Sequence, residues 1–268
     1  MDLNLIAVIV GIVEGLTEYI PVSSTGHMII VGHMLGFEGD LANVFDVFVQ
    51  LGAILSVIVI YRSKFEYFFT KEGWQLQENR MGVWHVAAGI VPTMLFAFFV
   101  HSAIKKYLFS PFTVAIGLFL GALLMIVAEK YTDNKEEFLV QDVDKISIRQ
   151  SFLIGFFQFL SLWPGFSRSG STIAGGLFVG ISRKTAADYT FIIAVPLMFV
   201  ACIYDLLKNI NLLHGSDFTV LAIGFVVSGI VAYISVLWFL KFLNKSRLTS
   251  FAIYRILLSL LTLYYFYC

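Results

Sequence analysis

Long apolar runs separated by short polar segments dominate the chain. Because about 20 consecutive apolar residues cross a bilayer as a helix, these runs predict membrane-spanning helices. Six such helices are expected, near residues 42–61, 82–100, 112–130, 186–207, 219–242 and 250–267. The fold class is therefore predicted to be all-α, a polytopic integral membrane protein.

Two further apolar stretches are interrupted in the middle. Residues 3–20 run into Pro21, two serines and a glycine, and a short helix follows to about Gly36. Residues 147–163 run into "WPGFSRSGS", and a short helix follows to about Gly180. Broken backbone at membrane depth is tolerated only where it is buried in protein or lines a wet cavity. Each stretch therefore predicts a re-entrant hairpin of two half-length helices.

The two interrupted stretches resemble each other. "GIVEGLTEYIPVSSTG" aligns with "GFFQFLSLWPGFSRSG", so that Gln158 takes the place of Glu14. Each copy is a hairpin followed by three spans, and this odd number of crossings would turn the second copy upside down. We therefore predict one membrane domain, 1–268, built from inverted repeats over 1–130 and 147–268. In such folds the broken helices meet near the midplane and form the functional site.

Composition and charge support this interpretation. Of the 268 residues, 59% are hydrophobic and 13% are charged, against about 25% charged in soluble domains. If both hairpins return to the side they came from, thirteen Lys and Arg residues share one side and only three lie on the other. The basic side carries the segments 62–80, 131–150, 183–184 and 241–247. Short cytoplasmic loops are rich in Lys and Arg, so both termini are expected to face outward. The formal net charge of zero argues against nucleic-acid binding.

Glu14 and Glu18 are four residues apart, so their side chains lie on one face of a helix. Ionisable groups within membrane segments are costly and usually mark ion paths or reaction sites. Two carboxylates could bind a hard divalent cation such as Mg²⁺ or Ca²⁺, or they could polarise a base. The alternative for Glu14 is a shallow, solvated position in the interface.

Ser23, Ser24 and Thr25 precede the second half-helix of the first hairpin. Residues of this kind are ordinary N-caps, but they also offer hydroxyl groups to a substrate phosphate. His27, a few residues further on, could act as a base for a serine, as a nucleophile toward phosphorus, or as a general acid.

Arg168 lies in the break of the second hairpin, between apolar helices, where its charge requires an anion. Its planar guanidinium group suits phosphate, and the N-terminus of the following helix also favours anions. The alternative is a purely structural ion pair with Glu14 or Glu18. Further hydrogen-bond donors are available from Ser167, Ser169, Ser171 and Thr172.

Carboxylates, hydroxyls, a histidine and an arginine at membrane depth predict phosphoryl transfer, which depends on positioning and on neutralising charge. The substrate would then be a lipid phosphate or diphosphate. A transporter or lipid flippase is the rival interpretation, because inverted repeats with broken helices are typical of secondary transporters. The Ser/His/Arg cluster favours hydrolysis, because transport does not strictly need it.

The motifs "EGLTEYIPVSSTGH" and "PGFSRSGST" resemble those of the bacterial undecaprenyl-diphosphate phosphatases, also called bacitracin-resistance proteins. The pieces "FAIYR", "VFVQLGAIL" and "AVPLMF" extend this likeness over nearly the whole chain. The resemblance implies hydrolysis of undecaprenyl diphosphate to undecaprenyl phosphate and inorganic phosphate, which recycles the lipid carrier for cell-wall synthesis. It also implies bacitracin resistance, dependence on Mg²⁺ or Ca²⁺, and an active site toward the outer face of the bacterial plasma membrane.

The resemblance also implies roles for individual residues. Glu14 and Glu18 correspond to a metal-associated or base-activating pair, and Arg168 corresponds to a phosphate clamp. Ser24 and His27 are rival nucleophiles, and direct attack by an activated water is also open. The second copy has Leu162 where a second carboxylate would lie, so only the first copy holds paired acids. The sequence does not fix the oligomeric state and leaves a homodimer open.

Overall fold

The computed structural model describes residues 2–108, 110–133, 139–215 and 217–267. Within these ranges the chain is helical and has no named strand, so the all-α prediction is confirmed. The α-helices are α1 (Leu3–Thr17), α2 (Ser24–Leu35), α3 (Asp40–Ile60), α4 (Arg62–Phe68), α5 (Val83–Tyr107), α6 (Pro111–Thr132), α7 (Ile148–Gln158), α8 (Arg168–Phe178), α9 (Arg183–Asn209), α10 (Asp217–Leu243) and α11 (Thr249–Tyr267).

Six helices in the described ranges are long and apolar enough to cross a membrane: α3, α5, α6, α9, α10 and α11. They coincide with the six predicted spans. The largest difference is in α5, which ends at Tyr107 rather than near residue 100. Helix α9 begins at Arg183 rather than near residue 186, because the Ser182 side chain caps it by accepting a hydrogen bond from the Thr185 N–H. The segment 62–80, predicted as a loop, contains the short helix α4.

Both interrupted stretches are pairs of half-length helices, α1–α2 and α7–α8, as predicted. The second helix of each pair is capped by a serine, Ser23 or Ser167, which accepts a hydrogen bond from the N–H of Gly26 or Gly170. The φ angles of the two serines are 72° and 71°, in a region that non-glycine residues rarely adopt. The same strained turn therefore occurs at the same register in both stretches.

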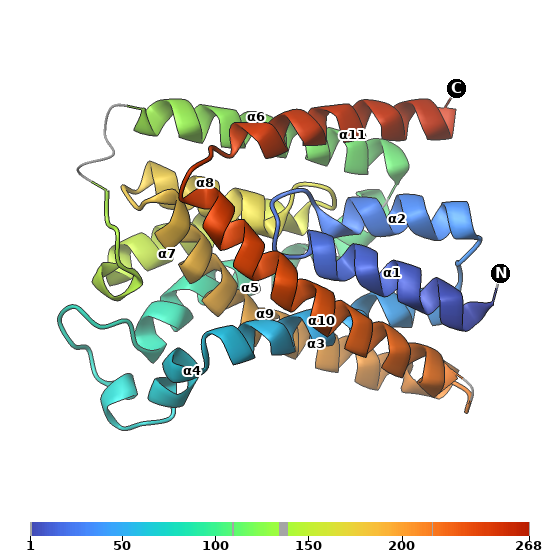
Figure 1. Ribbon diagram of the computed structural model, residues 1–268, viewed down its shortest axis with the longest axis horizontal. Helices are drawn as coiled ribbons and strands as arrows, with labels where there is room; N and C mark the ends of the chain where they lie inside the picture. The colour runs from blue at the N-terminus through green and yellow to red at the C-terminus, as the bar shows by residue number, and fades with distance from the viewer. Residues whose placement is uncertain (1, 109, 134–138, 216, 268) are drawn as a thin grey trace.

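The two hairpins enter from opposite ends of the molecule (Figure 1). The α1–α2 hairpin opens toward the end that holds both chain termini, and α7–α8 opens toward the other end. Helix α1 packs against α10, and α7 packs in a corresponding way against α5. These features agree with the proposed inverted repeats, while the match of 1–130 to 147–268 stays a prediction.

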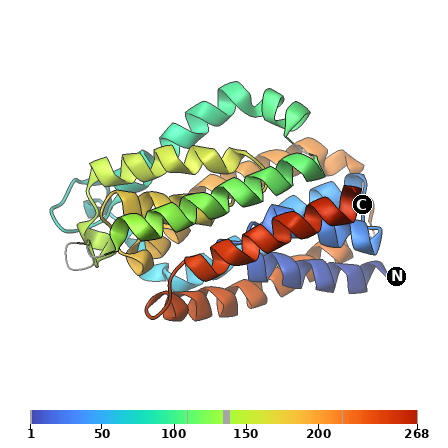
Figure 2. The same ribbon diagram turned by 90° about the horizontal axis from the view of Figure 1, so that it is seen from above.

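The connections from α3 to α5 and from α10 to α11 lie at the end opposite the termini (Figures 1 and 2). This end carries Arg62, Lys64, Arg80 and Arg247. The structure thus separates these basic connections from the termini along the length of the helices, which is the arrangement that the charge pattern predicts.

Small residues allow the helices around the hairpins to approach closely. A Cβ atom added at Gly52 of α3 would lie 2.1 Å from the Phe225 carbonyl oxygen of α10, and one added at Gly15 of α1 would lie 2.7 Å from the Ser228 carbonyl oxygen. Helix α8 consists largely of Ser, Gly, Thr and Ala and is buried from Ser169 onward through most of its length. Such residues let membrane helices pack backbone against backbone, which holds both hairpin tips inside the bundle.

Candidate active site

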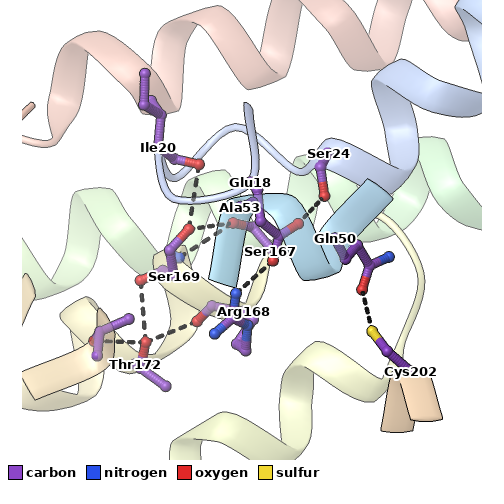
Figure 3. A network of polar contacts seen from close by, with 12 residues as sticks. Glu18, Ile20, Ser24, Gln50, Ala53, Ser167, Arg168, Ser169, Thr172 and Cys202 are labelled. Carbon is purple, nitrogen blue, oxygen red and sulfur yellow. Dashed lines mark hydrogen bonds and ion pairs between the residues drawn. The ribbon is translucent and has the colours of Figure 1, made fainter. Parts of the chain in front are cut away.

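The tips of the two hairpins meet at Glu18, just after the end of α1. Arg168 Nη2 donates to Glu18 Oε1 at 2.5 Å, and Ser24 Oγ donates to Glu18 Oε2 at 2.5 Å (Figure 3). One carboxylate therefore joins the first residue of α2 to the first residue of α8, which lies 150 positions away from Glu18. The predicted meeting of the two broken stretches is present in the structure.

Two atoms of charged side chains beside this contact, Glu14 Oε1 and Arg168 Nη1, are buried and lack a hydrogen-bond partner among the described residues. Glu14 lies one turn before Glu18 on α1 and is only 1% exposed, which does not fit the solvated interfacial alternative. An unsatisfied buried polar group is costly. These two atoms are therefore the ones best placed to bind a cation and an anion, respectively.

The Glu18–Arg168 pair is shielded from solvent on both sides, with side-chain exposures of 8% and 13%. The Arg168 guanidinium group lies 5.8 Å from the centre of the Tyr19 ring, which is held edge-to-face by Phe191. The ion pair of Arg168 with Glu18, which was the structural alternative for this arginine, is therefore present. Because Arg168 Nη1 has no partner in the described structure, the pair still leaves the guanidinium group a donor for a substrate.

Most of the predicted phosphate-binding hydroxyls make internal hydrogen bonds. Ser23 and Ser167 cap their helices, Ser169 Oγ donates to the Ile20 carbonyl at 3.2 Å, and Thr172 Oγ1 donates to the Arg168 carbonyl at 2.8 Å (Figure 3). These bonds shape the two tips. Contact of these hydroxyls with a phosphate stays a prediction, as it does for the exposed Thr25.

His27 does not contact Ser24 in this structure. Its Nδ1 lies 2.8 Å from the Ser23 carbonyl oxygen, and its Nε2 lies 2.7 Å from the Tyr254 hydroxyl. A carbonyl can only accept, so Nδ1 carries a proton, and in the neutral ring Nε2 then accepts from Tyr254. Of the two bases considered for Ser24, the structure brings only Glu18 into contact with it. Sequence reasoning missed Tyr254, although it lies in the "FAIYR" piece.

Other polar residues of the membrane segments make contacts between helices. Gln158 Nε2 lies 3.3 Å from Thr93 Oγ1, and Asp188 accepts a hydrogen bond from the Tyr61 hydroxyl at 2.6 Å. Arg255 donates to backbone carbonyl groups. None of these contacts reaches Glu18.

The residues near Glu18 suit a hard cation that keeps part of its water shell. Within the described ranges no three His, Cys, Asp or Glu side chains form a metal-binding group. Glu14 and Glu18 nevertheless provide carboxylate oxygens, one of them buried without a partner in the described structure. Mg²⁺ is commonly bound through one or two carboxylates together with substrate phosphates. The donor set therefore fits the Mg²⁺ or Ca²⁺ expected from the sequence.

Comparison with known proteins places the chain in a family. The model of the family described as bacitracin resistance protein BacA matches residues 7–261. The chain is 46% identical over 257 residues to undecaprenyl-diphosphatase 1 of Bacillus cereus, with 96% of each chain covered. It is also 46% identical over 255 residues to undecaprenyl-diphosphatase 1 of Bacillus anthracis, with 95% of each chain covered. The chain therefore belongs to the bacitracin resistance protein BacA family.

Proposed function

We propose that this protein hydrolyses undecaprenyl diphosphate to undecaprenyl phosphate and inorganic phosphate. The relatives that the chain matches over nearly their whole length carry the name of this activity. The structural observation that supports it is the contact of Glu18 with both Ser24 and Arg168. A base, a hydroxyl nucleophile and a phosphate-binding guanidinium group meet there at the tips of two buried hairpins. Transport alone gives no reason for a hydroxyl group bonded to this carboxylate.

The geometry supports a mechanism in which Ser24 is the nucleophile. Arg168 and the N-terminus of α8 bind the diphosphate through donors that favour anions. Glu18 accepts the hydroxyl proton of Ser24 while Ser24 Oγ attacks the terminal phosphorus atom. The bond from that phosphorus to the bridging oxygen breaks, and undecaprenyl phosphate leaves. Water then attacks the phosphoserine and releases inorganic phosphate.

Two alternatives to this mechanism differ in the attacking atom. Water activated by Glu18 would give no covalent intermediate, and attack by His27 would give a phosphohistidine. Acid quenching preserves phosphoserine but destroys phosphohistidine, whereas alkaline quenching has the opposite effect. Rapid quenching of labelled substrate followed by peptide mapping would therefore identify Ser24 by an acid-stable adduct. Absence of any adduct under both conditions would favour direct attack by water.

Glu14 and Glu18 would hold Mg²⁺ or Ca²⁺ through their carboxylate oxygens. The bound ion would supply positive charge against the diphosphate, in addition to that of Arg168. This assignment is supported by the buried Glu14 Oε1 beside Glu18, which has no partner among the described residues.

We further propose that the protein lies in the bacterial plasma membrane with its termini and active site toward the outer face. The termini and the opening of α1–α2 lie at the same end of the molecule (Figure 1), which supports this orientation. The basic character of the opposite end supports it as well. Hydrolysis at this face would recycle the lipid carrier for cell-wall synthesis and confer bacitracin resistance. A homodimer, left open by the sequence, stays a prediction.

The direct test is phosphate release from undecaprenyl diphosphate by the purified protein, with and without Mg²⁺ or Ca²⁺. Glu18→Gln and Arg168→Lys should each lower kcat/KM by at least about 100-fold, since each removes a group that acts on the reacting phosphate. Glu38→Gln changes a carboxylate at an exposed loop position and should retain wild-type activity. No release by well-folded wild-type protein would refute the proposal, and lipid flipping in liposomes would then be assayed.

A further inference from the structure

Helix α11 contacts the tips of both hairpins through two adjacent residues. The Tyr254 hydroxyl bonds to His27 Nε2 in the first hairpin at 2.7 Å. Arg255 Nη2 donates to the carbonyl oxygens of Gly165 and Phe166 in the second hairpin, at 3.0 and 2.6 Å. Successive side chains of a helix point about 100° apart, so one turn of α11 reaches two different tips.

Hydrogen bonds connect Tyr254 to the His27 ring and the His27 ring to the carbonyl group of Ser23, the residue before Ser24. Tyr254 fixes the His27 ring, which also stacks on the tyrosine with 5.7 Å between ring centres. His27 Nδ1–H holds the carbonyl group of Ser23, the residue with the left-handed φ of 72°. Ser24 follows directly, and its hydroxyl contacts Glu18.

The contact from Arg255 leads to Arg168 in a parallel way. Arg255 is fully buried, and in the part of the chain that the structure describes its hydrogen bonds go to backbone carbonyls and one thioether, without an acidic partner. The Phe166 carbonyl that it holds belongs to the peptide before Ser167, whose φ is 71°. Arg168 follows directly and contacts Glu18.

Strained backbone persists only where the surroundings hold it in place. At the first tip α11 holds His27, which in turn holds the carbonyl group of the strained Ser23. At the second tip α11 holds the carbonyl group just before the strained Ser167. In both cases the residue after the strained serine reaches Glu18. We propose that Tyr254 and Arg255 are positioning residues for the hydrolysis, Tyr254 aiming Ser24 through His27 and Arg255 aiming Arg168. This inference rests on the proposed function.

The two positioning residues should affect different kinetic constants. Ser24 takes part in the chemical step, so Tyr254→Phe should lower kcat about tenfold with KM nearly unchanged. Arg168 binds phosphate, so Arg255→Lys should raise KM and the inhibition constant for inorganic phosphate about tenfold each. A loss of stability alone would also lower the apparent kcat and leave KM unchanged, so the rates of every variant are expressed per amount of folded protein.

A double-mutant cycle tests whether Tyr254 acts through His27. In His27→Asn the amide can still donate to the Ser23 carbonyl, so this variant should keep more activity than His27→Ala. Adding Tyr254→Phe to His27→Asn should cause no further loss of kcat, since the tyrosine has lost its partner. A further tenfold loss would show that Tyr254 does not act through His27.

Ser259→Ala provides the matched control. Ser259 lies one turn after Arg255 on α11 and donates to the Ala115 carbonyl of α6 at 2.8 Å, rather than to a residue of either tip. Its kinetic constants should match those of the wild type even if the melting temperature falls. Equal kinetic losses in Ser259→Ala and Tyr254→Phe would overturn the proposal, as would unchanged kcat and KM in both Tyr254→Phe and Arg255→Lys.

Thermal-shift titration with inorganic phosphate needs no turnover. It would therefore test the Arg255 contact even if wild-type protein released no phosphate from undecaprenyl diphosphate, the outcome that refutes the proposed function. Weaker phosphate protection in Arg255→Lys than in Ser259→Ala is expected, and equal protection would contradict the inference. If Arg255→Lys fails to fold, Tyr254→Phe, which removes only the hydroxyl of a half-exposed side chain, still tests the contact of α11 with the first tip.

Discussion

Glu18 is the residue on which the chemistry of this site converges. It accepts hydrogen bonds from Ser24 and from Arg168, and Glu14 lies one helical turn before it. When both acids are ionised, two carboxylates and one guanidinium group in a buried place leave negative charge that a cation can neutralise. This balance explains why a protein without a cluster of three metal-binding side chains in its described part could still depend on a divalent ion.

Removal of the cation should therefore abolish hydrolysis. We expect excess chelator to stop phosphate release and Mg²⁺ or Ca²⁺ to restore it. Glu14→Gln should raise the half-saturating cation concentration about tenfold or more, because it removes one of two carboxylate ligands. Titration of activity against free Mg²⁺ measures this shift, with Glu38→Gln as the control. Full activity in excess chelator would contradict the assignment.

The strained serines offer a second prediction at this scale. At Ser167, alanine would keep the unfavourable φ, while glycine would relieve it. The free energy of unfolding of Ser167→Gly should therefore exceed that of Ser167→Ala. Ser147 caps α7 with an ordinary φ of −80° and serves as the control, because it isolates the capping preference alone. The difference at Ser167 should exceed that at Ser147 by about 1–2 kcal/mol, measured by denaturation in detergent.

The chemical groups of the site could be predicted from the sequence more readily than the residues that those groups contact. The spacing of Glu14 and Glu18 and the isolation of Arg168 among apolar helices are local patterns, and they are enough to indicate a charged site. The Tyr254 contact with His27 spans 227 positions, and no local pattern predicts so distant a partner. The same holds for Arg255, whose acceptors are backbone carbonyls with no side-chain signature.

At the scale of elements, packing is set by small residues on the helices that support the hairpins. The hydropathy pattern predicted the spans, and proline with glycine predicted the breaks, because both signals are local. Which helices pack together depends on contacts such as Gly52 against Phe225 and Gly15 against Ser228. A glycine on a helix face reveals that something approaches closely, but it does not reveal which helix approaches.

Gly52→Ala should separate α3 from α10. The added methyl group would overlap the Phe225 carbonyl oxygen, at 2.1 Å, and overpacking of this kind costs about 1–3 kcal/mol. We expect a lower melting temperature in detergent. Gly215→Ala, whose Cβ would meet no atom of the described residues within 4 Å, should leave the melting temperature unchanged. If Gly52→Ala melted at the wild-type temperature, the interface between α3 and α10 would have to be looser than this close approach implies.

At the scale of the whole molecule, the two ends of the protein differ in the chain termini and connections that they hold. Both termini and the opening of α1–α2 lie at one end, and the α3–α5 and α10–α11 connections lie at the other (Figure 1). Charge bias in the sequence predicted this separation, because it depends only on where Lys and Arg fall relative to the spans. The meeting of the two tips inside the bundle depends on tertiary packing, and only the repeat hinted at it.

Cysteine labelling in intact cells tests the orientation. With Cys202 and Cys268 replaced by alanine, a single cysteine at Glu38, near the end that holds the termini, should react with a membrane-impermeant maleimide. A single cysteine at Glu72, on the opposite side, should react only after lysis. The reverse pattern would place the termini and the opening of α1–α2 in the cytoplasm.

The position of α11 after both hairpins in the chain has a consequence for biosynthesis. A ribosome delivers α1 and its carboxylates to the membrane long before it delivers Arg168, and it delivers α11 later still. Until α11 inserts, the nascent chain holds the parts of a reaction centre without the contacts that align them. On the proposed function, full hydrolytic activity therefore begins only after α11 has inserted beside the two tips.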